Sequence, residues 1–439
     1  MTEPHKPSFA IDLSEFKRGW RIIVVTLLGL AVSANVAMLY GFGAMVIPLQ
    51  TEFGWSRGEL QPAISFLFVG AVVGAQLFGL LLERYGMKRL TLLSLIGLTL
   101  VFASMSLIGR SVLWLYLLCF LLPIFGMGAQ HTTWTQLIAL WYERNRGLAL
   151  ALMLTGTGLS AAIMPSAVTW ANARWGWQGP FLLMAVLPLA VFPLMWCWMK
   201  LPGTAQGKSA GSAGAVAGGV AESATAAPLV SDAQSGLSFR EGMRAPRFWL
   251  LNLALGLAVA GMITMISNAV PLLRDKGLSA VEASQVFGSF GLALISGRVL
   301  VGYLVDRLWA PGVAAVAMSL PAFGCLLLLN SGGDQIALLT LGLLLIGIGA
   351  GAEFDVAAFL IMRYFGMRHY ARLFGVHIGV TTAAASVAPW LFGRLYTATG
   401  SYTTMLSICG VGFFIGAVLL LCLGRYPHFR LEPAPQVAT

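Results

Sequence analysis

Three charged residues lie deep inside long apolar runs, and they are the residues of this sequence most able to do chemistry. Arg298 lies in the run 282–305, and Glu353 and Asp355 lie in the run 336–361. A charge at such depth in a membrane costs roughly 3 kcal/mol or more, so it faces protein or water and usually marks a pathway. An arginine offers a planar fork of donors that fits a carboxylate and stays charged at any pH. We expect Arg298 to be the counter-charge of a small organic anion, the alternative being a structural ion pair.

The spacing of these residues places the three charges at one depth. Asp355 lies eight residues before Arg363, and Arg298 lies eight residues before Asp306. At about 1.5 Å per residue, the charges lie roughly 12–15 Å from the ends of their helices. Glu353 and Asp355 are about 200° apart around a helix, so only one of them can face Arg298. We expect one of them to carry a proton, because substrate on the arginine would change its proton affinity. The alternative is a permanent buried pair.

Three further polar residues inside apolar runs are candidates for substrate contact. His131 and its neighbour Gln130 lie in the run 112–140, and titration near neutral pH suits a histidine to proton coupling. Tyr40, eight residues before Pro48, is placed to contact substrate across a cavity. The alternative for each is a packing residue with a satisfied hydrogen bond. The expected substrate-binding set is Arg298, Tyr40, His131 and Gln130, with His377 a weaker candidate.

Composition shows that these residues belong to an integral membrane protein. The 439 residues are 58% hydrophobic and 10% charged, whereas soluble domains carry about 25% charged residues. A membrane helix needs about 20 apolar residues. Twelve such runs are present, at 21–49, 59–82, 90–109, 112–140, 147–170, 179–199, 247–273, 282–305, 312–329, 336–361, 373–396 and 403–424.

The basic residues predict the orientation of these helices. With an N-terminus in the cytoplasm, 20 of the 27 Lys and Arg residues fall on the cytoplasmic side and 6 on the outer side. This bias predicts that both termini are cytoplasmic, in a bacterial-type inner membrane. The net charge of +10 therefore reflects short loops and not a nucleic-acid partner. The first 20 residues are polar, so we expect the first run to be an uncleaved helix in the lipid bilayer.

Neither a metal site nor a cofactor site is expected. The five cysteines lie in apolar runs with no CxxC pair and no histidine partner, so buried free thiols are the simplest interpretation. No phosphate-binding loop of the GKS or GKT type is present, so transport would be driven by a gradient. No nucleophile–base set lies within the spans, so we expect no enzyme.

The chain divides at a segment rich in Gly, Ala and Ser, from Gly203 to Gly236, which predicts a flexible cytoplasmic linker. Six apolar runs precede it and six follow it. The expected organisation is a tail at 1–20, a six-helix bundle at 21–200, the linker at 201–245, a second six-helix bundle at 246–425 and a tail at 426–439.

The two bundles repeat each other at a constant offset of 223 residues. The matching pairs are Pro48/Pro271, Gly54/Gly277, Ser56/Ser279, Glu59/Glu282, Gly74/Gly297, Gly79/Gly302, Glu83/Asp306 and Arg84/Arg307. Parallel repeats of six helices belong to secondary transporters, whose binding site lies near the midplane between the repeats. Arg298 maps onto Ala75, and Glu353 maps onto Gln130, so the shared scaffold does not itself require these charges.

These residues resemble a known family. Segment 79–89, GLLLERYGMKR, resembles the signature G-x-L-x-D-R-x-G-R-[KR] of the major facilitator superfamily, with Glu83 in place of the usual aspartate. Segment 302–307 resembles a second, degenerate copy. The segments at 40–48, 53–57, 142–149 and 363–366 are similar to the monocarboxylate porter branch, which includes oxalate–formate exchangers.

The resemblance implies twelve helices in two pseudo-symmetric bundles and a helix-eight arginine, here Arg298, that binds substrate carboxylate. Two features of the branch are missing. Leu39-Tyr40-Gly41 replaces its acidic-Gly motif, and Leu294 stands where the animal transporters have an aspartate. These departures leave the substrate and the coupling ion open.

The charges that recur in both bundles are expected to form a cytoplasmic gate whose pairs break and reform during alternating access. The alternative is ordinary loop turning and topology determination. The gate residues are Glu83, Arg84, Lys88, Asp306, Arg307 and Arg363.

Together these features predict a monomeric, all-α, twelve-helix transporter of a small carboxylate, with a proton as coupling ion. Three alternatives stay open. A carboxylate exchanger differs only in the counter-substrate, and efflux of lipophilic compounds would need no arginine at position 298. A membrane receptor or scaffold would bind a ligand without moving it.

Overall fold

The computed structural model describes residues 13–143, 145–201 and 236–427, and these residues are almost entirely helical. No β-strand is found among them, and a single isolated bridge joins Gly236 to Gly366. The helices in chain order are α1 (Leu13–Ala31), α2 (Ala34–Phe53), α3 (Arg57–Leu60), α4 (Pro62–Tyr85), α5 (Met87–Met105), α6 (Val112–Phe125), η1 (Met127–Ala129), α7 (His131–Trp141), α8 (Arg146–Trp175), α9 (Gln178–Trp198), α10 (Phe239–Arg244), α11 (Pro246–Asp275), α12 (Ala280–Val305), α13 (Ala310–Asn330), α14 (Ile336–Phe365), α15 (Tyr370–Thr399) and α16 (Thr403–Leu421).

These helices account for the twelve predicted spans, so the prediction of an all-α membrane protein is confirmed. Eleven helices in the described residues are long and apolar enough to cross a membrane, and the shorter α6 continues through η1 into α7. Two of the predicted runs are interrupted by non-helical backbone, whereas Gln61 between α3 and α4 keeps helical dihedral angles. The run 21–49 breaks between α1 and α2, and the run 112–140 breaks between α6 and α7. Hydrophobic periodicity alone does not reveal such breaks, because the apolar residues continue on both sides.

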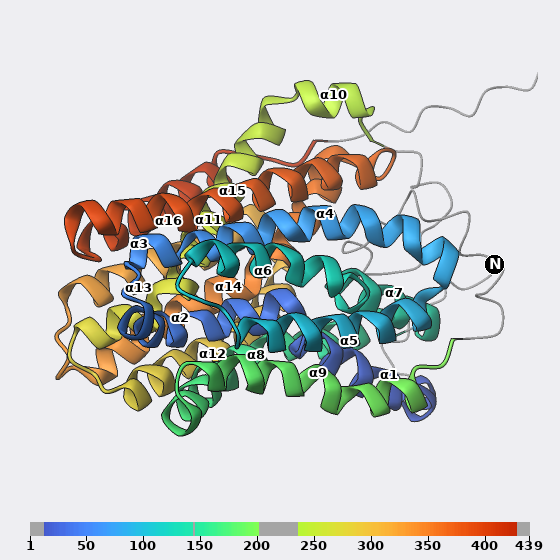
Figure 1. Ribbon diagram of the computed structural model, residues 1–439. Helices are drawn as coiled ribbons and strands as arrows, with labels where there is room; N and C mark the ends of the chain where they lie inside the picture. The colour runs from blue at the N-terminus through green and yellow to red at the C-terminus, as the bar shows by residue number, and fades with distance from the viewer. Residues whose placement is uncertain (1–12, 144, 202–235, 428–439) are drawn as a thin grey trace, which may run out of the picture.

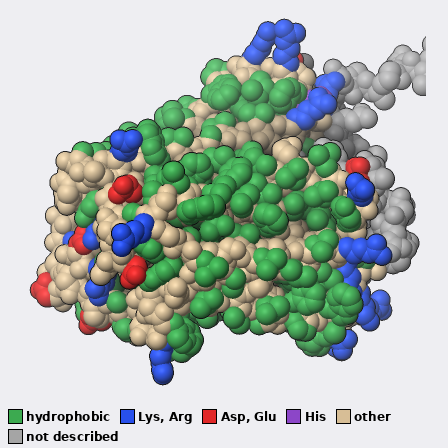
Figure 2. Space-filling view, in the orientation of Figure 1, with side chains coloured by type: hydrophobic (Ala, Val, Ile, Leu, Met, Phe, Trp, Pro, Cys, Tyr) green, Lys and Arg blue, Asp and Glu red, His purple; other side chains and the backbone are tan. Residues whose placement is uncertain are grey.

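The long helices lie side by side along one axis, and their connections gather at two ends (Figure 1). A broad belt of hydrophobic side chains covers the middle of the molecule (Figure 2). Lys and Arg side chains gather at the end where α4 gives way to α5, which we call the basic face. Acidic and basic side chains mix at the end where α2 and α11 finish, which we call the opposite face.

The 223-residue repeat is visible in local structure. Gly54 and Gly277 both adopt a positive φ, 71° and 99°, where the chain turns after a helix. Two residues later Ser56 and Ser279 each cap the following helix in a capping box with the glutamate three residues on. The recurring glycine and serine therefore have the same structural role in both repeats. We call the described residues before position 202 the N-half and those from 236 onward the C-half.

Matching glycines also bring helices together inside each half. A Cβ on Gly74 of α4 would lie 2.8 Å from the carbonyl oxygen of Pro123 in α6, and one on Gly297 of α12 would lie 2.4 Å from that of Ile348 in α14. Only glycine allows backbones this close, as expected for small residues at helix contacts in membranes.

The predicted domain limits stay predictions, although some helix ends bear on them. Most of the expected linker, residues 202–235, lies outside the described residues, and its final part contains the short helix α10. Helix α1 already begins at Leu13, inside the expected N-terminal tail.

Candidate functional site

Arg298 lies within α12, seven residues before its last residue Val305, and its side chain is only 11% exposed. Its Nη1 donates hydrogen bonds to the carbonyl oxygen of Leu154 at 3.0 Å and to Thr157 Oγ1 at 3.4 Å. Both acceptors belong to α8, so this arginine of the C-half is held against the N-half. It therefore lies at the interface of the two repeats, where the repeat predicted a binding site.

Asp355 of α14 is the carboxylate that faces this arginine. Arg298 Nε and Asp355 Oδ2 are 3.6 Å apart, an ion pair too long for a hydrogen bond. Glu353 is buried and has no hydrogen-bond or ion-pair partner among the described residues. Thus only one of the two carboxylates pairs with the arginine, as the 200° separation required.

The guanidinium of Arg298 has hydrogen-bond donors that are not used. Within the described residues, Arg298 Nε makes no hydrogen bond and Nη2 has no partner. The Asp355 side chain is 32% exposed although it lies ten residues before the end of α14. Because a carboxylate at that depth faces the protein interior or a water-filled cavity and not lipid, this exposed part is accessible from inside the bundle. The arrangement can accept an anion beside the arginine without first breaking a tight salt bridge.

Close helix packing fixes this pair in place. A Cβ on Gly351 of α14 would lie 2.2 Å from the carbonyl oxygen of Leu294 in α12. One helical turn further along each helix come Asp355 and Arg298. On the other side of α12, a Cβ on Gly291 would lie 2.3 Å from the backbone nitrogen of Ala162 in α8. Glycines on both faces of α12 therefore bring α14 and α8 within reach of one arginine.

The other predicted substrate-contact residues gather near Arg298. Tyr40 of α2 and His131 at the start of α7 both lie within electrostatic range of the Arg298 guanidinium. Gln130 precedes His131 as the N-cap residue of α7. The structure thus brings together side chains from α2, α7, α12 and α14, and their roles stay predictions.

His377 lies elsewhere and is satisfied. It is buried in α15, and its Nδ1 lies 3.0 Å from Asn252 Oδ1 in α11. The Asn252 amide nitrogen donates to the Phe248 carbonyl, so its oxygen is the atom that accepts from the imidazole. This geometry matches the packing alternative for His377.

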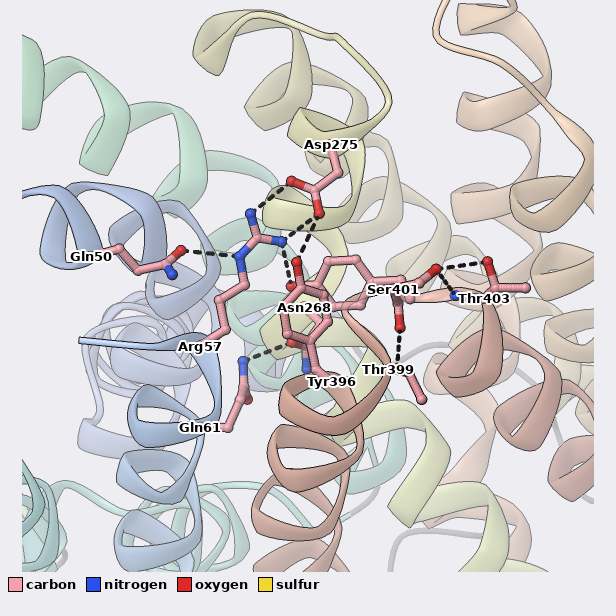
Figure 3. Close-up of polar contacts among 10 residues, drawn as sticks. Gln50, Arg57, Gln61, Asn268, Asp275, Tyr396, Thr399, Ser401 and Thr403 are labelled. Carbon is pink, nitrogen blue, oxygen red and sulfur yellow. Dashed lines mark hydrogen bonds and ion pairs between the residues drawn. The ribbon is translucent and has the colours of Figure 1, made fainter. Parts of the chain in front are cut away.

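A cluster of polar residues joins the halves at the opposite face (Figure 3). Arg57 of α3 donates two hydrogen bonds to the carboxylate of Asp275 at the end of α11, at 2.5 and 2.7 Å. Its remaining donors reach Gln50 Oε1 at 3.0 Å and Tyr402 Oη at 3.2 Å. We call Arg57, Asp275, Gln50 and Tyr402 the outer latch.

Two further hydrogen bonds join the halves on this side. Gln61 Nε2 donates to Asn268 Oδ1 at 2.8 Å, and the hydroxyls of Thr169 and Ser284 are 2.6 Å apart. Every hydrogen bond and ion pair between the halves in the described part of the chain lies between the depth of Arg298 and the opposite face. The halves are therefore fastened on that side.

The predicted gate residues on the basic face behave differently, since each stays within its own half. Lys88 Nζ donates to the carbonyl of Trp196 at 2.7 Å. The guanidinium of Arg307 lies 3.7 Å from the centre of the Tyr303 ring. The other cation–π contacts of gate residues are Lys88 over Trp196, Arg84 over Tyr85, and Arg363 over Phe359 and Tyr426. The side chains of Glu83 and Asp306 have no hydrogen-bonded partner among the described residues.

Partial burial raises the pKa of Asp306, which follows the last residue of α12. No hydrogen bond or ion pair links the two halves at this face in the described ranges.

The sequence reasoning missed the outer latch, although a usable signal exists. Arg57 maps by the repeat onto Ala280, so it fails to recur, as Arg298 fails to recur at Ala75. Its partner Asp275 maps onto Glu52, so that acidic position recurs. The absence of a matching charge in the other repeat supported the choice of Arg298, and the same comparison applies to Arg57.

Comparisons with known proteins agree with this fold. The sequence profile of the Major Facilitator Superfamily matches residues 25–389. A gallate transporter of Pseudomonas putida is 27% identical over 435 residues, covering 95% of this chain and 94% of the relative. Monocarboxylate transporter 13 of Bos taurus is 24% identical over 426 residues, covering 95% and 91%. The crystal structure of a D-xylose-proton symporter superposes with a TM-score of 0.70 at 13% identity, covering 92% of this chain and 97% of that one.

Proposed function

Because the chain belongs to the Major Facilitator Superfamily, we propose that it is a secondary transporter of organic acids in which Arg298 binds the substrate carboxylate. The proposal rests on the position and the unused hydrogen-bond donors of the Arg298 guanidinium. It is buried at the interface of the two halves, and its Nε and Nη2 lack hydrogen-bond partners among the described residues. A carboxylate that accepts from both donors would be held bidentately.

The similar proteins support this class of substrate. One is named a gallate transporter and another a monocarboxylate transporter, and both names specify carboxylic acids or their transport. Family and relatives are transporters, in agreement with the expectation that the chain is no enzyme.

Alternating access explains why the two halves are hydrogen-bonded to each other at the opposite face and not at the basic face. The positive-residue bias supports a cytoplasmic basic face in a bacterial inner membrane. The structure then corresponds to the conformation that is closed toward the outside, with the outer latch formed. Opening outward breaks the bonds of Arg57 and brings the predicted gate residues of the basic face together. We propose that one monomer carries out this cycle.

Coupling to protons would use the carboxylates beside the arginine. Asp355 contacts Arg298 in the substrate-free arrangement, and a substrate carboxylate would compete for the same guanidinium. When substrate occupies the arginine, Asp355 loses its counter-charge and takes up a proton more readily. Substrate and proton are then carried together, which is symport.

Uptake by proteoliposomes tests the proposal. Labelled gallate and lactate are supplied with and without an inward proton gradient, for the parent protein and for Arg298→Gln. We expect the parent to accumulate an acid and Arg298→Gln to lose at least about 100-fold in initial rate, as for removal of one partner from a buried charged contact. The matched control is Arg394→Gln, at an exposed arginine near the end of α15, which should keep full uptake.

Full uptake by Arg298→Gln would refute a substrate role for the arginine and favour efflux of lipophilic compounds. Ligand binding without flux in the parent would identify a receptor instead.

A further inference from the structure

Two helices of the N-half are interrupted at the depth of the candidate site. The first span breaks at Val32 and Ser33 between α1 and α2, and the fourth breaks around η1 before Gln130. The positions that match Ser33 and Gln130 in the C-half are Gly256 and Glu353, and both lie within the continuous helices α11 and α14. The breaks therefore belong to one repeat only, and the shared scaffold does not explain them.

Buried polar atoms without partners accompany these breaks. Ser33 is 1% exposed, Thr133 is 0% exposed and Ser160 is 4% exposed, yet none of their hydroxyl oxygens has a hydrogen-bond partner. The same holds for the side-chain atoms Gln130 Nε2 and Asn35 Oδ1. Proteins satisfy nearly all buried polar groups, so a cluster of unsatisfied ones in a transporter points to a bound molecule as the missing partner. We call these five residues the hydroxyl subsite.

Helix packing places Ser33 and Gln130 at one level. A Cβ on Gly29 of α1 would lie 2.2 Å from the ring of Trp134 in α7. Ser33 is one turn beyond Gly29, and Gln130 is one turn before Trp134. Because the first and fourth spans run in opposite directions, these two steps lead to the same depth. The Trp134 indole also donates to the Ala129 carbonyl at 3.0 Å, which holds the break at that position.

Helix α8 brings the hydroxyl of Ser160 to the same region. A Cβ on Gly156 would lie 2.4 Å from the carbonyl oxygen of Leu27 in α1. Ser160 follows Gly156 by four residues on the same helix face, as Ala31 follows Leu27. Ser160 therefore lies beside the end of α1 and the break that leads to Ser33.

The chemistry of the subsite selects a neutral group that both donates and accepts. An amide nitrogen donates, an amide oxygen accepts, and serine and threonine hydroxyls do both. None of the five side chains carries a charge, so a second carboxylate would lack a counter-ion here. Hydroxyl groups match this mixture of donors and acceptors.

We propose that the hydroxyl subsite binds the ring hydroxyls of a hydroxylated aromatic acid whose carboxylate lies on Arg298. The inference rests on the proposed function, because it uses Arg298 as the carboxylate site. The two ends of such a substrate contact opposite halves, and Ser160 follows Thr157, which accepts a hydrogen bond from Arg298, by three residues on α8.

Aromatic side chains lie at the interface between the two ends. Tyr40 of the N-half and Phe290 of the C-half face each other across the interface, with ring centroids 6.2 Å apart. Aromatic neighbours favour a flat ring, and a rigid ring holds a carboxylate and a distant hydroxyl without loss of conformational freedom on binding. A 2-hydroxy acid such as lactate cannot do this, because its hydroxyl lies next to its carboxylate.

Paired substrates in proteoliposomes test the inference. Initial uptake rates are measured for benzoate and 4-hydroxybenzoate, which differ by one hydroxyl, in the parent protein, Gln130→Leu and Ser33→Ala. We expect the parent to prefer 4-hydroxybenzoate by at least about tenfold, because a site built for a hydroxyl rejects the analogue that lacks it. Gln130→Leu should reduce that preference about five- to tenfold and Ser33→Ala about two- to fivefold. Both variants should lose more uptake of 4-hydroxybenzoate than of benzoate, and a monodisperse elution profile in detergent shows that they are folded.

Gln335→Leu is the matched control, at an exposed glutamine with no side-chain hydrogen bond, and should keep the preference of the parent. Equal rates for both acids in the parent overturn the inference, as does an equal loss for both acids in Gln130→Leu and Ser33→Ala. These results leave the proposed function intact. Undiminished uptake by Arg298→Gln instead overturns the proposed function.

Discussion

The two halves of this protein share a scaffold but differ in what they place at the interface between them. The C-half presents charges, Arg298, Asp355 and Glu353, from continuous helices. The N-half presents neutral polar groups from interrupted helices, and Gln130 occupies the position that matches Glu353. Features common to both halves maintain the fold, whereas Arg298, Asp355 and Gln130 have no counterpart of the same type in the other half. Alterations to shared and unshared positions should therefore have different consequences.

The largest expected effect comes from the carboxylates that only the C-half has. Asp355→Asn should lower uptake driven by a proton gradient by about tenfold or more, because the arginine loses the group that exchanges with substrate. Exchange of labelled for unlabelled acid at equal pH, which needs no net proton movement, should persist. Glu353→Gln tests the second carboxylate in the same assays.

Thr132→Ala is the matched control for Asp355→Asn, because Thr132 is the N-half position that matches Asp355. Gradient-driven uptake that survives unchanged in both Asp355→Asn and Glu353→Gln would remove the proton role from the C-half. The difference between the charged C-half and the neutral N-half would then affect substrate binding and not proton coupling.

Shared glycines provide the next largest effect, and it should fall on both halves alike. Gly74→Ala and Gly297→Ala each place a Cβ within 2.8 Å of a neighbouring carbonyl oxygen, so helix pairs α4–α6 and α12–α14 must separate. Overpacking of this kind costs about 1–3 kcal/mol. We expect lower melting temperatures in detergent for both variants.

The controls for these substitutions are Gly79→Ala and Gly302→Ala. These glycines also match by the repeat, but no atom lies within 4 Å of an added Cβ. Neither variant should lower the melting temperature. A large drop in melting temperature for Gly297→Ala with none for Gly74→Ala would show that the halves differ in packing as well as in chemistry.

The sequence predicted the shared features better than the unshared ones. Apolar runs identified the spans, and the 223-residue offset paired serines and glycines that the structure shows to cap and pack helices in both halves. Helical spacing also placed Arg298 level with Asp355. Choosing Asp355 over Glu353 required the rotation of α14, which depends on packing at Gly351.

The helix breaks and the outer latch escaped prediction for physical reasons. Val32 and Ser33 fit an apolar run equally well whether the helix is continuous or broken, so periodicity carries no signal there. Arg57 and Asp275 are 218 residues apart, so local periodicity and spacing carry no signal for their contact. The predicted gate residues are separate in this structure.

The outer latch offers a smaller, conformational test, because it fastens the two halves to each other. The Asp275 side chain is 39% exposed, so its pair with Arg57 is only partly shielded from water. Loss of the pair in Arg57→Gln should cost the closed state about 1 kcal/mol, a shift of roughly fivefold toward the outward-open state. Labelling of Ser284→Cys in a cysteine-free background by an impermeant maleimide measures that shift, since Ser284 is buried between the halves.

Exchanging the two charges provides the control for the latch. The double variant Arg57→Asp with Asp275→Arg should restore slow labelling, because the ion pair re-forms with reversed polarity. Labelling as slow in Arg57→Gln as in the parent would show that Gln61–Asn268 and the packing around it hold the face closed without the latch.

The smallest expected effects come from the paired helix caps, and they should be nearly equal. Ser56 accepts a hydrogen bond from the backbone N–H of Glu59, and Ser279 accepts one from that of Glu282. Loss of an N-cap hydroxyl typically costs about 0.5–1 kcal/mol at an exposed helix end. Ser56→Ala and Ser279→Ala should each lower the melting temperature by about 1 °C without changing substrate preference, since a protein of this size moves by only a few degrees per kcal/mol. A change in substrate preference at either serine would mean that a shared position also acts on substrate, which contradicts the division between scaffold and site.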